Sequence, residues 1–127
     1  MLPLLLSLAL IGCNEDESPS GYANQGAEYV LREINGASYP ERATLIFPEE
    51  GRITGSAPCN SFSGTLLAPY PWFELGPLAV TRRACPDLPA ESQFFTALQR
   101  MKLIEFSGSV LILSTTEGEE MIFTIGD

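Results

Sequence analysis

The stretch GRITGSAPCNSFSG at residues 51–64, followed after a short connector by FELGPLAVTRRACP at residues 73–86, decides the fold of this chain. Its short apolar runs are broken by glycine and proline, a texture typical of β-strands joined by tight turns. Each half contains one cysteine, Cys59 and Cys85, and a helical pattern begins directly after the second. If these two cysteines are joined, they attach a strand-and-loop region to the start of that helix.

The composition fits one modest domain and limits its chemistry. The chain has 127 residues, of which 45% are hydrophobic, enough for one core. Sixteen acidic and seven basic residues give a net charge of -9, which argues against binding to nucleic acid or to anionic lipid. No histidine is present, so the commonest zinc ligand and the usual base of a serine or cysteine nucleophile are missing. We expect no enzymatic activity, metal or cofactor.

The N-terminus has the pattern of an export signal. Residues 1–12, MLPLLLSLALIG, are apolar and uncharged, and they are fewer than the ~20 residues of a membrane-spanning helix. The tetrapeptide Leu10-Ile11-Gly12-Cys13 resembles the lipobox of bacterial lipoproteins, in which the peptide is cleaved before a cysteine that then carries lipid. This resemblance implies a signal peptide over residues 1–12 and a lipid anchor at Cys13. The alternative is a buried apolar N-terminal strand.

The next segment separates that anchor from the domain. Residues 14–26, NEDESPSGYANQG, are acidic and rich in turn formers, which predicts a flexible tether over residues 13–26. An ordered N-terminal arm is the alternative. In enteric-type bacteria an aspartate after the lipidated cysteine favours the inner membrane, and its replacement by Asn14 points to the outer membrane, facing the periplasm.

The remaining chain, residues 27–127, predicts a mainly antiparallel sheet. Apolar runs separated by turn residues predict strands, and Asn35-Gly36 is a strong hairpin signal. Gly55 marks a bulge or a close approach of two backbones. We expect a loop at residues 38–40 and strands at residues 27–34 (or a short helix there), 43–47, 52–56, 65–67, 72–81 with a break at Gly76-Pro77, 103–106, 110–113 and 121–125.

One helix is expected after Cys85. Asp87 is a candidate N-cap, and Glu91 favours the positive end of the helix. Phe94, Leu98 and Met101 share one face at helical spacing, which indicates packing on the sheet. The predicted fold class is α+β: an antiparallel half-barrel of seven to eight strands with one packed helix.

An ordered set of motifs resembles the META/HslJ-like domain. It consists of Leu31 with Ile34-Asn35-Gly36, then residues 51–56, 59–64, 76–82 and 84–86, and the similarity extends over roughly residues 26–126. The resemblance implies a β-rich half-barrel with one helix. It also implies a small bacterial envelope lipoprotein linked to heat shock or antibiotic tolerance, in a family without an established enzymatic activity.

Export of the protein would determine the oxidation state of the remaining cysteines. Two remain after lipidation of Cys13, and an oxidising compartment favours a structural disulfide between Cys59 and Cys85. Two free buried thiols are the alternative. A redox-active pair is disfavoured, because no Cys-x-x-Cys spacing and no histidine are present.

Four residues are candidates for binding. Asn60 lies among serines that have no histidine base, so we expect it to satisfy loop backbone groups. Arg82 and Arg83 form a basic cluster that suits a carboxylate or phosphate, although an internal salt bridge for one of them is the favoured alternative. Trp72 belongs to the run YPWF at residues 70–73, a contact site if exposed and core if buried, the latter being favoured.

Two functions remain after these exclusions. The first is a non-enzymatic envelope lipoprotein, an assembly or stress factor that binds a partner protein, a peptide or an apolar molecule. An open apolar groove on the concave face of the sheet would support the apolar ligand, and a filled interior would weaken it. The second is an exported protease inhibitor that uses the loop near Cys59.

Overall fold

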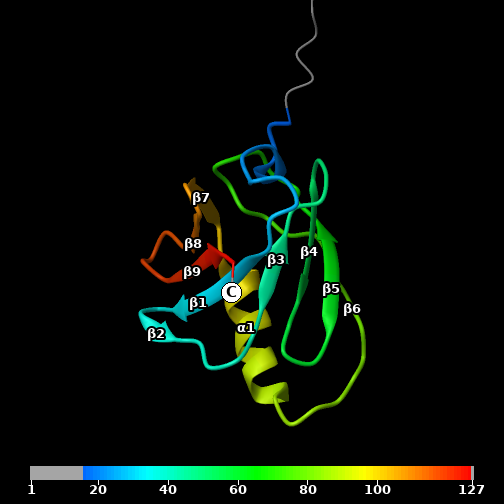
Figure 1. The fold of residues 1–127 in the computed structure, drawn as a ribbon. Coiled ribbons are helices and arrows are strands. Elements are labelled where there is room, and N and C mark those ends of the chain that lie inside the picture. The colour runs from blue at the N-terminus through cyan, green and yellow to red at the C-terminus, as the bar shows by residue number, and fades with distance from the viewer. Residues whose placement is uncertain (1–15, 127) are drawn as a thin grey trace, which may run out of the picture.

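The computed structural model describes residues 16–126, so the expected signal peptide and Cys13 lie outside the described residues (Figure 1). Over this range the chain forms one antiparallel sheet and one α-helix. The elements are η1 (Pro19–Gly21), β1 (Tyr29–Ile34), β2 (Ala37–Ser38), β3 (Thr44–Ile46), β4 (Arg52–Ser56), β5 (Ser61–Thr65), β6 (Ala79–Val80), α1 (Leu88–Arg100), β7 (Leu103–Ser107), β8 (Val110–Ser114) and β9 (Glu120–Ile125).

The strand order is β6-β5-β4-β3-β1-β9-β8-β7, with β2 paired to β1 outside this path. The first long strand therefore lies beside the last one, and Tyr29 is opposite Ile125. Within residues 16–126 nine strands are present where seven to eight were expected, and two of them, β2 and β6, have only two residues each. The α+β class and the mainly antiparallel half-barrel are confirmed.

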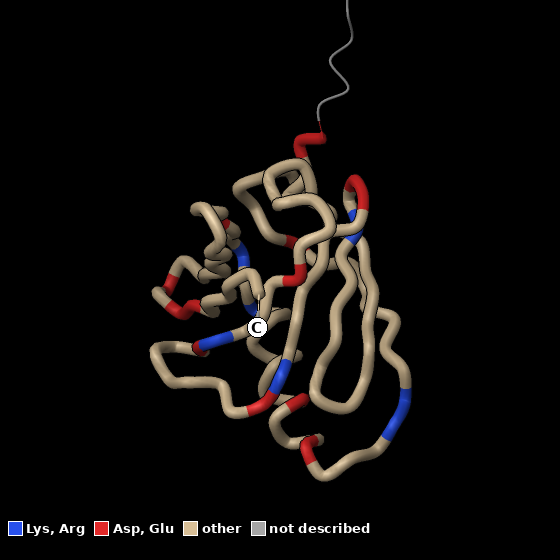
Figure 2. The backbone as a smooth tube through the Cα atoms, in the orientation of Figure 1, with Lys and Arg blue, Asp and Glu red and all other residues tan. Residues whose placement is uncertain are grey.

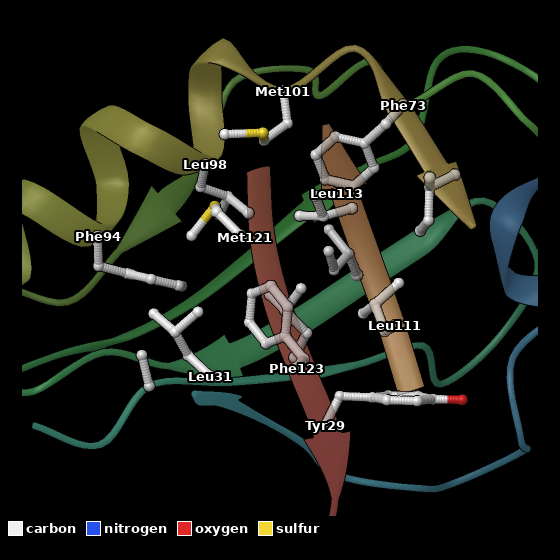
Figure 3. Packing of buried hydrophobic residues seen from close by; sticks show 14 of the residues in the cluster. Tyr29, Leu31, Phe73, Phe94, Leu98, Met101, Leu111, Leu113, Met121 and Phe123 are labelled. Carbon is white, nitrogen blue, oxygen red and sulfur yellow. The ribbon is translucent and has the colours of Figure 1, made fainter. Parts of the chain in front are cut away.

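The core fills the space between the sheet and α1. Phe94, Leu98 and Met101 are buried, as their helical spacing predicted. Figure 3 shows these three side chains directed from the helix side towards residues of β8 and β9, among them Leu113 and Phe123. Burial of such side chains contributes about 1.5–3 kcal/mol each, which explains why the helix is held on the sheet.

Two local features of the fold, one turn and one close contact between strands, depend on glycine residues. Asn35 and Gly36 both have positive φ angles, 50° and 81°, and form the two-residue turn between β1 and β2 that the sequence predicted. At Gly55, a Cβ atom would lie 2.0 Å from the carbonyl oxygen of Thr44 and 2.5 Å from the ring of Phe62. Gly55 is therefore a site of close approach, while the pairing of β4 stays regular around it.

The expected strand at residues 72–81 is wrong in extent. Only Ala79–Val80 forms a strand there, while Leu66 pairs with Leu75 and Trp72 pairs with Leu103 as isolated bridges. Residues 66–75, the bridging segment, thereby connect the end of β5 with β7. Its apolar residues produce a strand-like pattern because Phe73 is buried at this junction. The strand expected at residues 65–67 is also wrong in extent, because β5 runs from Ser61 to Thr65. The expected loop at residues 38–40 gives its first residue to β2.

The segment before β1 packs against the domain. The carbonyl oxygen of Glu17 accepts a 2.7 Å hydrogen bond from the amide of Tyr70, and the Ser18 hydroxyl accepts one of 3.0 Å from the amide of Gly51. Tyr22 stacks on Tyr70 with ring centroids 4.0 Å apart. Residues 16–26 thus make the contacts of the ordered N-terminal arm, the alternative to a flexible tether.

Candidate functional site

The motif residues of the sequence meet at the start of α1. Cys59 and Cys85 form a disulfide with their Cα atoms 5.7 Å apart. This bond joins the turn before β5 to the loop that leads into the helix. The predicted pairing is therefore confirmed, and it places residues 59–61 beside residues 81–85.

A buried carboxylate organises this junction. Glu91, in the first turn of α1, is only 5% exposed. Its Oε1 atom accepts hydrogen bonds from the amides of Cys59 at 3.0 Å and Asn60 at 2.8 Å, and Oε2 accepts one of 2.8 Å from Nδ2 of Asn60. Three donors compensate the cost of burying this group. Asp87 occupies the N-cap position as expected but makes no capping hydrogen bond through its side chain.

Sequence reasoning placed Glu91 at the helix start but missed its role in the site. A signal was available, because Glu91 precedes the buried Phe94 and Leu98 by three and seven positions. At 3.6 residues per turn these positions share the face of the helix that points into the protein. A carboxylate on the buried face of a helix indicates that hydrogen-bond donors lie on the segment packed against that face.

Asn60 also forms hydrogen bonds to the loop that follows β6. Its Oδ1 atom accepts hydrogen bonds from the amide of Arg83 at 2.6 Å and from the hydroxyl of Thr81 at 2.9 Å. Its Nδ2 atom also donates to the carbonyl oxygen of Arg83 at 3.0 Å. Asn60 is buried and satisfies loop backbone groups, as the sequence indicated. Residues 81–85 form what we call the arginine loop, fixed at one end by Asn60 and at the other by the disulfide.

Arg82 and Arg83 are both exposed on this loop. Among residues 16–126 the ion pairs are Arg42 with Glu28 and Arg100 with Glu119, so the internal salt bridge expected for Arg82 or Arg83 is not found within this range. Figure 2 shows the pair as a separate basic stretch in a backbone that otherwise carries many acidic residues. Two guanidinium groups on a fixed backbone can bind carboxylate or phosphate through several hydrogen bonds.

A hollow of about 350 Å³ adjoins the arginine loop on the β5–β6 surface. It is lined by Ser61, Phe62, Ser63, Ala79, Val80 and Thr81. Hydroxyl groups and the exposed Val80 give it mixed polar and apolar character. The arginine loop therefore lies beside a recess with a volume large enough for a side chain.

Trp72, the fourth candidate, lies elsewhere. It is 52% exposed, so the expectation that it belongs to the core is wrong, while its neighbour Phe73 is buried as expected. Trp72 is part of the bridging segment, at the end of the domain near η1, whereas the arginine loop lies at the opposite end, near the start of α1 (Figure 1). The structure joins Asn60, Arg82 and Arg83 in one site and leaves Trp72 separate.

The concave side of the sheet is filled rather than open. Side chains from α1 and the bridging segment, including Leu98 and Phe73, occupy it together with the inward-facing residues of the strands (Figure 3). This packing weakens the hypothesis of an apolar ligand held within the half-barrel. Within residues 16–126 no three acidic or cysteine side chains gather as a metal-binding group.

The sequence model of the META domain matches residues 23–125. The chain belongs to the META domain family. The match includes both cysteines of the disulfide and the whole arginine loop, and it begins within the ordered N-terminal arm.

Two structures solved by NMR resemble the fold of this META domain. One is 23% identical, covers 80% of this chain and 90% of its own, and superimposes with a TM-score of 0.60. The other, a protein from Burkholderia xenovorans, is 17% identical, covers 80% of this chain and 83% of its own, and has a TM-score of 0.61. No curated protein matches the chain. At these identities the structural likeness establishes the fold alone.

Proposed function

We propose that this META domain protein is a non-enzymatic lipoprotein of the bacterial cell envelope that acts as a binding factor in assembly or stress. It recognises an acidic segment of a partner protein through Arg82 and Arg83. The observation that carries this proposal is the exposure of both arginines on a backbone fixed by Asn60 and the Cys59–Cys85 disulfide. Arg82 and Arg83 are adjacent cations in a chain of net charge -9, and neither has an ion pair among the described residues.

Preorganisation lowers the free-energy cost of binding at the arginine loop. An arginine in a mobile loop loses conformational freedom when it binds, and that loss opposes association. Here the backbone of Arg83 is already held by two hydrogen bonds with the side chain of Asn60, which donates one and accepts the other. The loss of conformational freedom on binding therefore falls mainly on the arginine side chains. The bidentate geometry of a guanidinium–carboxylate pair also makes the interaction directional.

A catalytic role has little support in the residues of the site. Both oxygens of Glu91 are engaged by three donors, and the chain contains no histidine to act as a base. The protease-inhibitor alternative requires a loop near Cys59 that projects into an active site. Asn60 is instead buried and tied to Glu91, so no observation favours that function.

The proposed localisation to the cell envelope is supported by the lipobox-like sequence Leu10-Ile11-Gly12-Cys13. It is also supported by the disulfide, which suits an oxidising compartment. In residues 16–126 no helix has the length and apolar character needed to span a membrane. The test is mass spectrometry of protein purified from membranes. We expect an N-terminal Cys13 carrying diacylglycerol, and a Cys13→Ser variant released from the membrane fraction. An unmodified Cys13 in intact protein would disprove the lipoprotein proposal.

Partner binding is tested by a photo-crosslinking amino acid placed at Val80, which lines the hollow beside the arginine loop. We expect a defined crosslinked partner in envelopes of the native host, and loss of that product when Arg82→Glu and Arg83→Glu are introduced. Arg42→Glu combined with Lys102→Glu is the control, because it reverses two other exposed cations and so changes the net charge by the same amount. A product that survives the arginine changes, or one lost equally in the control, would contradict the proposal.

A further inference from the structure

Three exposed apolar side chains lie at the end of the domain where the chain leaves towards Cys13. Tyr22 is 51% exposed, Leu67 is 57% exposed and Trp72 is 52% exposed. Large side chains of this kind cost free energy in water when they are gathered at one place, and they mark surfaces that contact something else. We call this set the apolar end.

Contacts between two segments hold the apolar end together. Tyr22 stacks on Tyr70 of the bridging segment, whose amide donates to the carbonyl oxygen of Glu17. Leu67 and Glu17 line the same surface hollow. The amide of Trp72 donates a 2.8 Å hydrogen bond to the carbonyl oxygen of Pro69, in the turn between Leu67 and Trp72. Figure 1 shows the bridging segment, in green, beside the N-terminal segment, in blue.

The distance to the anchor is short. Glu17 and Ser18 are bonded to Tyr70 and Gly51, and the Ser18 amide donates to the carboxylate of Asp16 at 2.9 Å. The folded part of the chain therefore extends to Asp16, three positions after Cys13. Even fully extended, three residues reach only about 10 Å. A lipid on Cys13 holds this end of the domain within that distance of the bilayer surface.

We propose that the apolar end docks on a zwitterionic phospholipid bilayer, with Trp72, Tyr22 and Leu67 placed at the level of the headgroups. This inference rests on the proposed lipid anchor at Cys13. Tryptophan and tyrosine are the side chains enriched at membrane–water interfaces, because an apolar ring carries a polar group that stays hydrated. The anchor makes this contact intramolecular, so even a weak interaction suffices to orient the domain.

The charge around the apolar end determines which type of lipid it can contact. Acidic residues lie in the same two segments and in the neighbouring β3–β4 turn: Asp16, Glu17, Glu49, Glu50 and Glu74. Figure 2 shows the acidic positions near the N-terminal end. They repel an anionic surface within a Debye length of about 8 Å at physiological ionic strength. The apolar end therefore seats on zwitterionic lipid, and the arginine loop at the far end of the domain points away from it.

The chain contains a single tryptophan, so Trp72 reports on this contact directly. The acylated full-length mature protein is reconstituted in vesicles of phosphatidylcholine, and its fluorescence is compared with that of the Cys13→Ser protein in buffer. We expect emission at shorter wavelength, reduced quenching by aqueous acrylamide, and quenching by lipids brominated near the headgroup. With a large fraction of anionic lipid we expect these changes to weaken.

Two variants keep the probe and change its surroundings. Tyr22→Glu and Leu67→Glu are expected to return Trp72 towards the spectrum seen in water. Leu88→Glu is the matched control, because Leu88 is 40% exposed but begins α1 at the opposite end of the domain, and we expect it to leave the lipid signal unchanged (Figure 1).

Each other outcome overturns the inference in a recognisable way. An acylated protein whose Trp72 remains as accessible to acrylamide as in buffer retains its anchor and lacks the proposed docking. A Cys13 without lipid removes both the anchor and the docking. Shielding of Trp72 that depends on protein concentration without vesicles assigns the apolar end to a second copy of the chain instead.

Discussion

Nδ2 of Asn60 donates a 2.8 Å hydrogen bond to Oε2 of Glu91, thirty-one positions later in the chain. This bond joins the turn before β5 to the first turn of α1. Through the other contacts of Asn60 it also reaches Arg83. A buried acid and a buried amide thus link the packing of the helix to the backbone of the arginine loop.

Removal of the Glu91 carboxylate is expected to destabilise the fold. Glu91→Ala leaves two backbone amides and the side chain of Asn60 without an acceptor, which we expect to cost about 3 kcal/mol of unfolding free energy. Glu91→Gln keeps one acceptor oxygen but turns an amide towards Nδ2 of Asn60, for a loss of about 1 kcal/mol. Urea denaturation at neutral pH measures both. The exposed Gln99→Ala is the control, and equal stability of it and Glu91→Ala would refute the assignment.

Loss of the disulfide is expected to lower stability by about 3.5 kcal/mol, the chain-entropy value for its 26-residue separation. The double variant Cys59→Ala with Cys85→Ala is compared with the wild type by chemical denaturation. Alkylation of unreduced protein followed by mass spectrometry should find no free thiol at either position. Two labelled cysteines in protein from an oxidising compartment would contradict the pairing.

Asn60→Ala is expected to loosen the arginine loop while the sheet stays intact. The amide of Arg83 loses its 2.6 Å acceptor, so its hydrogen exchange should accelerate in the native protein. The amide of Ile104, bonded to Pro71 at 2.9 Å, is an internal reference that we expect to exchange at an unchanged rate. Unchanged protection at Arg83 would show that the loop is held by the disulfide alone.

Tyr39 links stability to alkaline pH. Its hydroxyl donates a 2.7 Å hydrogen bond to the carbonyl oxygen of Ala90 in α1. Burial, together with the nearby carboxylates of Glu41, Glu91 and Asp87, raises the pKa of Tyr39 from 10.0 to about 12. The unfolded chain ionises first, so this contribution is complete below pH 10 and is lost as the pH rises to about 12.

The comparison with Tyr39→Phe isolates this effect. At pH 8 we expect the variant to be less stable by about 1 kcal/mol, the value of the lost hydrogen bond. Between pH 10 and about 12 the two proteins should converge, since only the wild type loses stability through this hydroxyl. Denaturation curves at several alkaline pH values measure the difference, and parallel curves would argue against the raised pKa.

Much of the fold was predictable because short-range patterns determine it. Alternating apolar residues place β7, β8 and β9, and the Asn35-Gly36 turn places the first hairpin. The bridging segment was predicted wrongly, since isolated bridges such as Trp72 with Leu103 depend on a partner thirty-one residues away. Its sequence resembles a strand, while its conformation is set by that distant partner.

The site was predictable in its residues but not in its arrangement. Asn60, Arg82, Arg83 and both cysteines were candidates. Whether the arginines have ion pairs depends on where acidic groups lie in three dimensions, and within residues 16–126 they have none. Glu91 carried a readable signal in its spacing to Phe94. It was interpreted through the helix dipole, which accounts for an acid in the first turn but not for one on the buried face.

The bridging segment also bears on self-association. An unpaired strand edge offers free amide and carbonyl groups onto which another chain can add as an extra strand, the first step of aggregation. The edge strand β7 is partly covered, because Ile104 donates to Pro71 and Phe73 donates to Lys102. The other edge, β6, is only two residues long. Within the described residues the sheet thereby offers little template for fibril growth.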